Sequence, residues 1–388
     1  MKKTIFFIIL FIGCLFPAKA QKSKVISVFQ LIETGKYSEA KDAIEEAIKE
    51  DNTKTWYRTW YARGFLLQTA YQKGMKENDK DKYELYPDQL FEAFRSYQKA
   101  INLDTRNRID DQLAPLYVQL ANEFQKMGEK QYKNKHFKEA FRAFEQALEI
   151  INSPVLSLKT DQGLVYNTAL AAYESREWDK AADYLKNLHK DAYSSNASFL
   201  LYRIYLQKQD TAYAIKVLTE SIDKYNDNQN MVLLLADLLY QQDSIEKAVS
   251  VLEKASGKDS SNYIYPYTGG LIRQKNQQYQ QAIKAYREAL ELAPEESKIY
   301  AGIAICYYNI GVDIDEKARR IVNNHAYHKE KARSAEAFRS AVEWYEKACE
   351  KDPQNEEINE RLYQLYKFLN MPAKKTGLQE GKARISSH

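Results

Sequence analysis

The sequence of 388 residues has few of the residues that interrupt helices and few of those that usually carry chemistry. It contains 13 glycines and 8 prolines, and only 3 cysteines and 5 histidines. Ala, Leu, Glu, Lys, Gln and Tyr are abundant instead, a composition that favours helix and leaves no block rich in strand formers. The chain is longer than one hydrophobic core usually organises, so we expect several domains or a repeat array.

A strong charge of one sign is also missing. The 57 lysines and arginines nearly balance the 53 aspartates and glutamates, for a formal charge of +4, and the mean hydropathy is −0.63. The basic residues form no stripe along the chain. Such a chain has no long-range field to attract polyanions, so we expect no nucleic-acid partner.

Long apolar runs are absent except at the N-terminus. Lys2 and Lys3 precede an apolar run over residues 5–16, and Ala18-Lys19-Ala20 supplies small residues around a cleavage point before Gln21. A basic start, a short apolar segment and an A-x-A site are typical of a secretory signal peptide. The run is too short for a bilayer crossing, which needs roughly 20 apolar residues. The sequence therefore predicts a signal peptide over residues 1–20.

Two alternatives to a removable signal stay open. One is a retained membrane anchor, and the other is a lipoprotein modified at Cys14, although Phe11 stands where lipoprotein signals usually have leucine. Removal of residues 1–20 takes away three lysines and no acid, so the formal charge falls from +4 to +1. The mature chain is then expected to have no integral membrane span. We expect it in the periplasm or at the periplasmic face of the outer membrane, with outer-membrane association as a further alternative.

Two cysteines remain after this removal, Cys306 and Cys349. An oxidising compartment would permit a disulfide between them. Buried free thiols are the simpler interpretation and the one we prefer.

A small-large-small pattern recurs along the chain. Its form is A-x3-[aromatic or aliphatic]-x2-A, which places three side chains on one helix face. From Ala181 the steps to Ala214, Ala248 and Ala282 are 33, 34 and 34 residues. Further copies of the pattern begin at Ala40, Ala93, Ala140 and Ala341.

This period and pattern resemble the tetratricopeptide repeat family, whose unit is two antiparallel helices. In the family's frame the pattern opens the second helix at position 20. A small residue is expected twelve residues earlier, at position 8, where the two helices approach closely. Tyr202 breaks this rule in the fifth unit. Six units have a small residue at position 8: Gly64, Gly128, Ala169, Ala236, Gly270 and Ala304.

The resemblance implies an all-α fold, a right-handed α-solenoid of about eight antiparallel helix pairs with a capping C-terminal helix. One helix pair cannot bury its apolar stripe alone, so stacking of neighbours would form the core. The solenoid is expected over residues 21–371, with a flexible tail at 372–388. Its units are expected near residues 24–53, 55–105, 109–154, 161–193, 195–228, 229–262, 263–296 and 297–353, with the cap at 355–371.

Three units are longer than the repeat. The second has extra residues around 76–88, and the third begins with a long helix over about 113–132. In the eighth, residues 312–333 keep helical spacing on both sides of Asn323-Asn324. We therefore predict a helical hairpin there whose arms extend beyond the repeat body.

Motifs of catalysis are missing from the sequence. It has no glycine-rich phosphate loop, no H-E-x-x-H helix and no G-x-S-x-G elbow. His325 and His328 have a spacing that could bind a metal ion, but no further ligand is fixed beside them, and zinc sites use four. We therefore expect no enzyme activity, no cofactor and no metal.

The resemblance also implies a binding surface, because the family's first helices line a concave groove. Tyrosine is frequent at these positions and suits recognition. The function expected is a scaffold or adaptor that binds partner proteins. A glycan- or peptidoglycan-binding module is the alternative, and ordinary packing of the rings is equally compatible with the sequence. The candidate partner-binding residues are Tyr132, Tyr166, Tyr173, Arg203, Asp237, Tyr240, Tyr267 and Tyr308.

One subtype of the family grips the C-terminal carboxylate of a partner, using Lys at position 5 and Asn at position 9 of its first unit. No Lys occupies position 5 here. Position 9 holds Phe65, Glu129, Leu170, Arg203, Asp237, Leu271 and Ile305. The sequence therefore predicts that this carboxylate clamp is missing.

Overall fold

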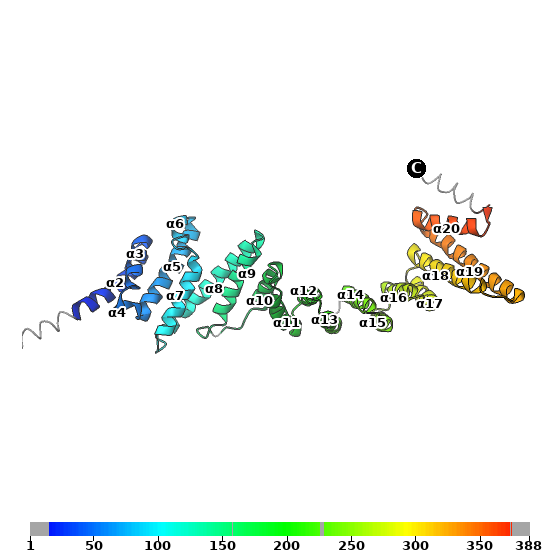
Figure 1. The fold of residues 1–388 in the computed structure, drawn as a ribbon. Coiled ribbons are helices and arrows are strands. Elements are labelled where there is room, and N and C mark those ends of the chain that lie inside the picture. The colour runs from blue at the N-terminus through cyan, green and yellow to red at the C-terminus, as the bar shows by residue number, and fades with distance from the viewer. Residues whose placement is uncertain (1–14, 157, 226–228, 373, 375–388) are drawn as a thin grey trace, which may run out of the picture. The chain divides into compact units, whose positions relative to one another are not determined.

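The computed structural model describes residues 15–156, 158–225, 229–372 and 374. In this part of the chain every regular element is an α-helix, and there are nineteen (Figure 1). The all-α solenoid predicted from the repeat is thereby confirmed. The contacts divide the chain into two compact units, one ending at Tyr193 and one beginning at Ser194. The repeat spacing gave no sign of this division.

The first unit contains four helix pairs. In each pair the two helices pack along one another, and neighbouring pairs are in contact. The short helices α4 (Asp51–Lys54) and α6 (Lys80–Tyr83) lie in connections. The pairs are α2 (Leu15–Glu33) with α3 (Tyr37–Ala47), α5 (Tyr57–Glu77) with α7 (Gln89–Leu103), α8 (Asp110–Lys133) with α9 (Phe137–Ile151), and α10 (Gln162–Glu174) with α11 (Trp178–Lys190).

The second unit repeats this arrangement and ends in a single helix, α20 (Glu356–Phe368), which packs against the last pair. Its pairs are α12 (Ser195–Gln207) with α13 (Thr211–Lys224), α14 (Gln229–Gln241) with α15 (Ile245–Lys258), α16 (Ile264–Lys275) with α17 (Tyr279–Leu292), and α18 (Ser297–Ala318) with α19 (Asn324–Lys351).

The turn inside a pair has the same backbone conformation in six of the pairs. One residue takes a left-handed conformation, and the backbone N–H of the next residue donates to a carbonyl oxygen in the last turn of the first helix. His136 N, for example, donates to Gln131 O at 2.9 Å. This is the hydrogen-bond pattern of a Schellman cap. Only the first pair uses glycine at the left-handed position, and the six residues are Gly35, Lys135, Arg176, Gln209, Asp243 and Gln277.

The close approach of the two helices in a pair, predicted at position 8, is confirmed at three glycines. A Cβ added to Gly64 would lie 2.6 Å from a ring carbon of Tyr97, and one on Gly128 would lie 2.6 Å from Phe144. Gly270 faces Tyr286 in the same way, at 2.7 Å. The glycines therefore leave the space that the large ring of the second helix fills.

The residue at position 8 of the first helix faces the residue at position 24 of the second helix, and their sizes vary together. Where position 8 is Ala169 or Ala236, the residue at position 24 is a leucine rather than an aromatic, Leu185 or Leu252. The exceptional Tyr202 is 6% exposed, and Leu218 stands at position 24 of its unit. The combination of Ala304 and Tyr345 departs from this trend.

Buried tyrosine hydroxyls in these pairs have partners on the first helix. The hydroxyl of Tyr97 donates to Oε1 of Gln68 at 2.9 Å, and that of Tyr286 donates to Oε1 of Gln274 at 2.8 Å. Both glutamines stand at position 12 of their repeats. A buried hydroxyl without a partner would cost free energy, so these two bonds complete the packing.

The predicted helical hairpin is confirmed by helices α18 and α19. Asn323 caps α19 by accepting a hydrogen bond from Ala326 N at 3.0 Å. The two arms are joined near their base, where Ser334 Oγ donates to Gly311 O at 2.8 Å. Further out, Asp315 forms ion pairs with Arg319 on its own helix and with Lys331 on the opposite arm.

The N-terminal predictions fall partly outside the described residues, which begin at Leu15 and so exclude Cys14 and most of the expected signal. Helix α2 runs through the expected cleavage point, and its described buried side chains are Val25, Val28 and Ile32. Of the expected tail only residues 372 and 374 are described. No helix of the described chain combines the length and apolar character that a bilayer crossing requires.

We predict that two adjacent glycines of α16 respond oppositely to alanine. In Gly270→Ala the new Cβ would overlap Tyr286, so stability should fall by about 1–3 kcal/mol. Gly269 has no atom within 4 Å of such a Cβ, so Gly269→Ala should be neutral or stabilising by up to about 1 kcal/mol. Urea unfolding followed by circular dichroism measures both. Equal effects of the two substitutions would contradict the close approach.

Candidate binding surfaces

The eight residues predicted to bind a partner all lie on first helices of the helix pairs, and they are distributed over both units. In the first unit they are Tyr132 on α8 and Tyr166 and Tyr173 on α10; in the second they are Arg203 on α12, Asp237 and Tyr240 on α14, Tyr267 on α16 and Tyr308 on α18.

Five of these tyrosines pack against an aromatic residue of their own repeat. Two of the contacts join Tyr166 to Tyr193, at 5.7 Å between centroids, and Tyr267 to Tyr286, at 5.8 Å. Tyr132 meets Phe137 with ring centroids 5.2 Å apart, and Tyr173 meets Trp178 at 5.3 Å. Tyr308 meets Phe338 at 5.5 Å, although the hairpin separates the two in sequence. Packing therefore fixes these rings. Tyr132 and Tyr173 are half-buried, whereas Tyr308 is 42% exposed.

Two of the predicted tyrosines lie near a lysine of the next first helix. The ammonium group of Lys275 on α16 lies 5.8 Å from the ring of Tyr240 on α14, and that of Lys298 on α18 lies 5.4 Å from the ring of Tyr267. Burial raises the pKa of Tyr132, with smaller contributions from Glu174 and Tyr166. Neighbouring repeats thus bring some of the predicted residues close together.

The two charged candidates are both exposed. Arg203 is exposed, with its guanidinium 6.0 Å from the ring of Phe199. Asp237 is exposed and accepts a hydrogen bond from Gln241 at 2.7 Å. The eight residues therefore form several local pairs along the first helices rather than one converging site.

A carboxyl group on the first-helix side of unit 1 was not predicted from the sequence. Glu123 of α8 faces α5, where the side-chain amides of Gln68 and Gln72 donate to it. Burial raises the pKa of Glu123 to about 7, against the weaker opposing effect of these two amides. Only the packing of α5 against α8 reveals this environment, because the sequence places Glu123 among ordinary helical glutamates.

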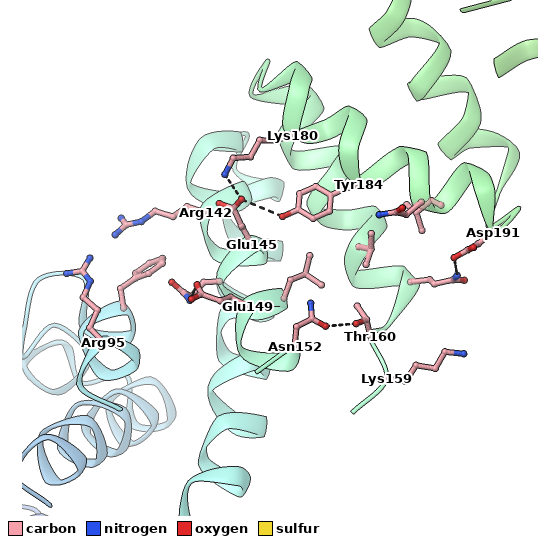
Figure 2. Close-up of a pocket in the computed structure, with 17 residues that line it drawn as sticks. Arg95, Arg142, Glu145, Glu149, Asn152, Lys159, Thr160, Lys180, Tyr184 and Asp191 are labelled. Carbon is pink, nitrogen blue, oxygen red and sulfur yellow. Dashed lines mark hydrogen bonds and ion pairs between the residues drawn. The ribbon is translucent and has the colours of Figure 1, made fainter. Parts of the chain in front are cut away.

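A hollow of about 870 Å³ lies on the other side of unit 1, among second helices. Its walls come from α7, α9 and α11, with residues of the connection to α10 and of the first turn of α10 (Figure 2). Lys180 and Tyr184 of α11 point toward Glu145 of α9, and Lys180 Nζ lies 2.5 Å from a Glu145 oxygen. The resemblance to the repeat family predicts a binding surface on the first helices, so this hollow among second helices was not predicted.

Most charges in this hollow are already compensated. The guanidinium of Arg142 lies 3.9 Å from the ring of Phe91 and pairs with Asp88 at 2.9 Å, while Arg95 pairs with Glu92. A wide polar surface of paired charges can form hydrogen bonds with a partner segment.

A second, more apolar hollow of about 520 Å³ lies in unit 2. It contains the predicted Tyr308 together with side chains of α19 and α20, including Phe338 and Phe368. Of the candidate residues, Tyr308 is the one that lines either of these two hollows.

The cysteines and histidines are separate from these surfaces. Cys306 is buried and Cys349 is half-buried, and no disulfide joins them. Burial raises the pKa of Cys306 to about 12, which makes it a poor nucleophile near neutral pH. His325 and His328 are exposed at the start of α19, and the described residues contain no group of three potential metal ligands.

Comparison with known proteins identifies repeats of one kind. Two family models, both described as tetratricopeptide repeat, match residues 205–264 and 267–311. The chain is also 22% identical over 259 residues to the Hsp70-Hsp90 organizing protein of Triticum aestivum, a match that covers 63% of this chain and 43% of that protein. It thus spans less than half the length of this curated relative.

Solved structures of bacterial repeat proteins also match. A TPR repeats protein from Bacteroides fragilis is 22% identical, with 64% of this chain and 98% of that chain covered and a TM-score of 0.37. The C-terminal part of a TPR repeat-containing protein from Cytophaga hutchinsonii is 17% identical, with 66% and 93% covered and a TM-score of 0.45.

We predict that the Glu123 carboxyl makes stability depend on pH. Its pKa is about 7 in the folded chain and ordinarily 4.5, so the unfolded chain ionises first and the folded state loses stability as pH rises through this interval. Glu123→Gln should therefore be about 1–2 kcal/mol more stable than the wild type at pH 8, and the difference should vanish near pH 4.

Urea unfolding at the two pH values measures this effect. Glu129→Gln is the matched control, because Glu129 is exposed on the same helix and its substitution should change little. A Glu123→Gln variant no more stable than the wild type at pH 8 would mean that the folded chain stabilises the ionised carboxylate.

Proposed function

Because this chain is a tetratricopeptide-repeat protein, we propose that it is a non-catalytic scaffold of the cell envelope that presents its first-helix faces to partner proteins. Repeat arrays of this kind create extended surfaces for protein interaction. The proposal rests on the observation that packing holds the first-helix tyrosines in place. Tyr132 and Tyr173 are each held by an aromatic of the same repeat and stay partly accessible.

A fixed aromatic side chain suits recognition for an energetic reason. Binding normally costs the entropy of ordering the contacting side chains, and a ring already held by its own repeat loses little more. Its hydroxyl can still form a directional hydrogen bond with a partner. The exposed charges of Arg203 and Asp237 would add specificity at the same face.

The name of the wheat relative refers to the chaperones Hsp70 and Hsp90, but we do not propose them as partners. The tetratricopeptide subtype that grips a C-terminal carboxylate needs a lysine at position 5 and an asparagine at position 9. This chain has aromatic residues such as Tyr61 and Tyr166 at position 5. Recognition of a partner's side chains is the mode that these surfaces favour.

The glycan alternative receives less support from the ring geometry. Stacking on a sugar needs an open, flat ring face. Tyr132 and Tyr173 are half-buried and meet their neighbours edge to face, at 64° and 70° between the rings. Packing therefore covers much of the surface that a glycan would use, and a protein partner is the better fit.

The proposed location in the cell envelope is inferred from the N-terminal sequence. The described buried side chains of α2 are Val25, Val28 and Ile32, all beyond the proposed cleavage point after Ala20. Removal of residues 1–20 would thus leave these core contacts of the first helix pair intact. The periplasm, or the periplasmic face of the outer membrane, is the compartment that we propose.

We expect charge reversal on the first-helix face to disrupt partner binding. The test recovers partners from an envelope extract with the tagged mature chain and its variants, and quantifies them by mass spectrometry. Asp237→Lys should reduce recovery of a specific partner by about tenfold or more, the effect of losing a hot-spot contact. Glu288→Lys, an equal charge change at an exposed site on the second helix α17, should leave recovery unchanged.

Repeated recovery of no specific protein would argue strongly against a scaffold. Equal losses with Asp237→Lys and Glu288→Lys would argue against the first-helix face as the binding surface.

Export makes a separate prediction. The full chain expressed in a bacterium with an outer membrane should yield an envelope protein whose N-terminal residue is Gln21, as read by mass spectrometry. A chain that keeps residues 1–20 and stays in the cytosol would refute export. A lipid on Cys14 would replace the soluble periplasmic location with a membrane-anchored one.

A further inference from the structure

The apolar hollow of unit 2 is built by the inserted hairpin and the capping helix. In a repeat of ordinary length, α18 would end near Gly311, but here it continues to Ala318. Val312 and Glu316 of this extension and Arg319, which follows it directly, line one side of the hollow. The insertion, whose role the repeat pattern left unassigned, therefore supplies a wall that the repeat alone lacks.

Three aromatic rings follow one another across the hollow. Tyr308 of α18 meets Phe338 of α19 with ring centroids 5.5 Å apart, and Phe338 meets Phe368 of α20 at 5.0 Å. Phe338 is buried, but Tyr308 is 42% exposed and Phe368 is 65% exposed. Two large rings at the ends of the row thus offer apolar surface that this unit does not cover.

The charges around these rings are not balanced. Arg319 pairs with Asp315 at 2.8 Å, and Arg361 pairs with Glu357 on its own helix at 2.9 Å. The carboxylates of Glu316 and Glu360 also line the hollow, and neither has an ion pair with a described residue. Glu360 accepts only the uncharged amide of Gln364, at 2.7 Å. Asp315 is shared between Arg319 and Lys331. The charged side chains that line the hollow are three carboxylates and two guanidinium groups, so their charges still sum to −1.

We infer that this hollow binds a partner segment in which a large apolar or aromatic side chain stands next to a lysine or arginine. The apolar side chain would cover the exposed rings of Tyr308 and Phe368. The adjacent cation would pair with Glu316 or Glu360, so a segment with acidic flanks would be rejected. This inference deepens the proposed scaffold function and rests on it, but concerns a different surface from the charged first-helix face at Asp237.

Fluorescence anisotropy with three labelled short peptides tests whether binding needs both the large apolar side chain and the adjacent cation. In a Gly/Ser background the peptides carry Trp-Arg, Ala-Arg or Trp-Glu at their centre. The mature chain should bind the Trp-Arg peptide at least about tenfold more tightly than either of the others. Equal binding of all three peptides, or none, would overturn the inference.

Substitutions then locate the binding. Phe368→Ser should weaken the Trp-Arg peptide at least about tenfold, whereas Val322→Ser should not, because Val322 is a fully exposed apolar residue outside the hollow. The double variant Glu316→Gln/Glu360→Gln should weaken binding and reduce its salt dependence. Glu343→Gln, at an exposed position of α19, is the matched control. Circular dichroism checks that each variant is folded.

Other occupants of the hollow give distinct results. A chain ending at Lys374 that binds the peptide more than tenfold better than the full chain would show that residues 375–388 occupy the hollow. A dimer that dissociates on Phe368→Ser would show that a second copy does. Either result overturns the inference. If the peptide fails but partner recovery still depends on Asp237, only this inference fails; if both fail, the scaffold function fails with it.

Discussion

The fold depends on how closely the two helices of each pair can approach. At Gly64, Gly128 and Gly270 the absence of a side chain lets a ring from the second helix lie against the first-helix backbone. Tyr286 shows the consequence most fully, because Gly270 of α16 and Gly302 of α18 lie on it and the ring is fully buried. One aromatic ring thus joins two successive repeats, which is how a chain without a central core gains cooperative stability.

This packing also determines what is left for binding. A second-helix aromatic fills the interior of each pair that has glycine at position 8. First-helix aromatics such as Tyr132 and Tyr173 are only partly packed. The hairpin at α18 and α19 departs from this packing pattern. It extends α18 beyond the repeat and, with α20, leaves Tyr308 and Phe368 exposed beside the carboxylates of Glu316 and Glu360. The interrupted repeat therefore presents exposed rings next to carboxylates, whereas the regular repeats present partly packed tyrosines.

The sequence predicted the features that depend on local spacing. The small residues at position 8, the hairpin around Asn323 and the first-helix location of the tyrosines follow from a period of 34. It could not predict features that need two separate segments in contact. The raised pKa of Glu123 depends on α5, the partner of Tyr308 is Phe338 on the far side of the insertion, and the hollow in unit 1 joins three repeats.

The most direct test of the central constraint is a double-mutant cycle at Gly128 and Phe144. Ala opposite Leu occurs naturally at positions 8 and 24 of two other repeats, so Phe144→Leu should relieve the overlap that Gly128→Ala creates. Urea unfolding should then give a favourable coupling of about 1 kcal/mol or more between the two changes. Strictly additive effects would contradict the account, because they would mean that the two residues do not share one packing space.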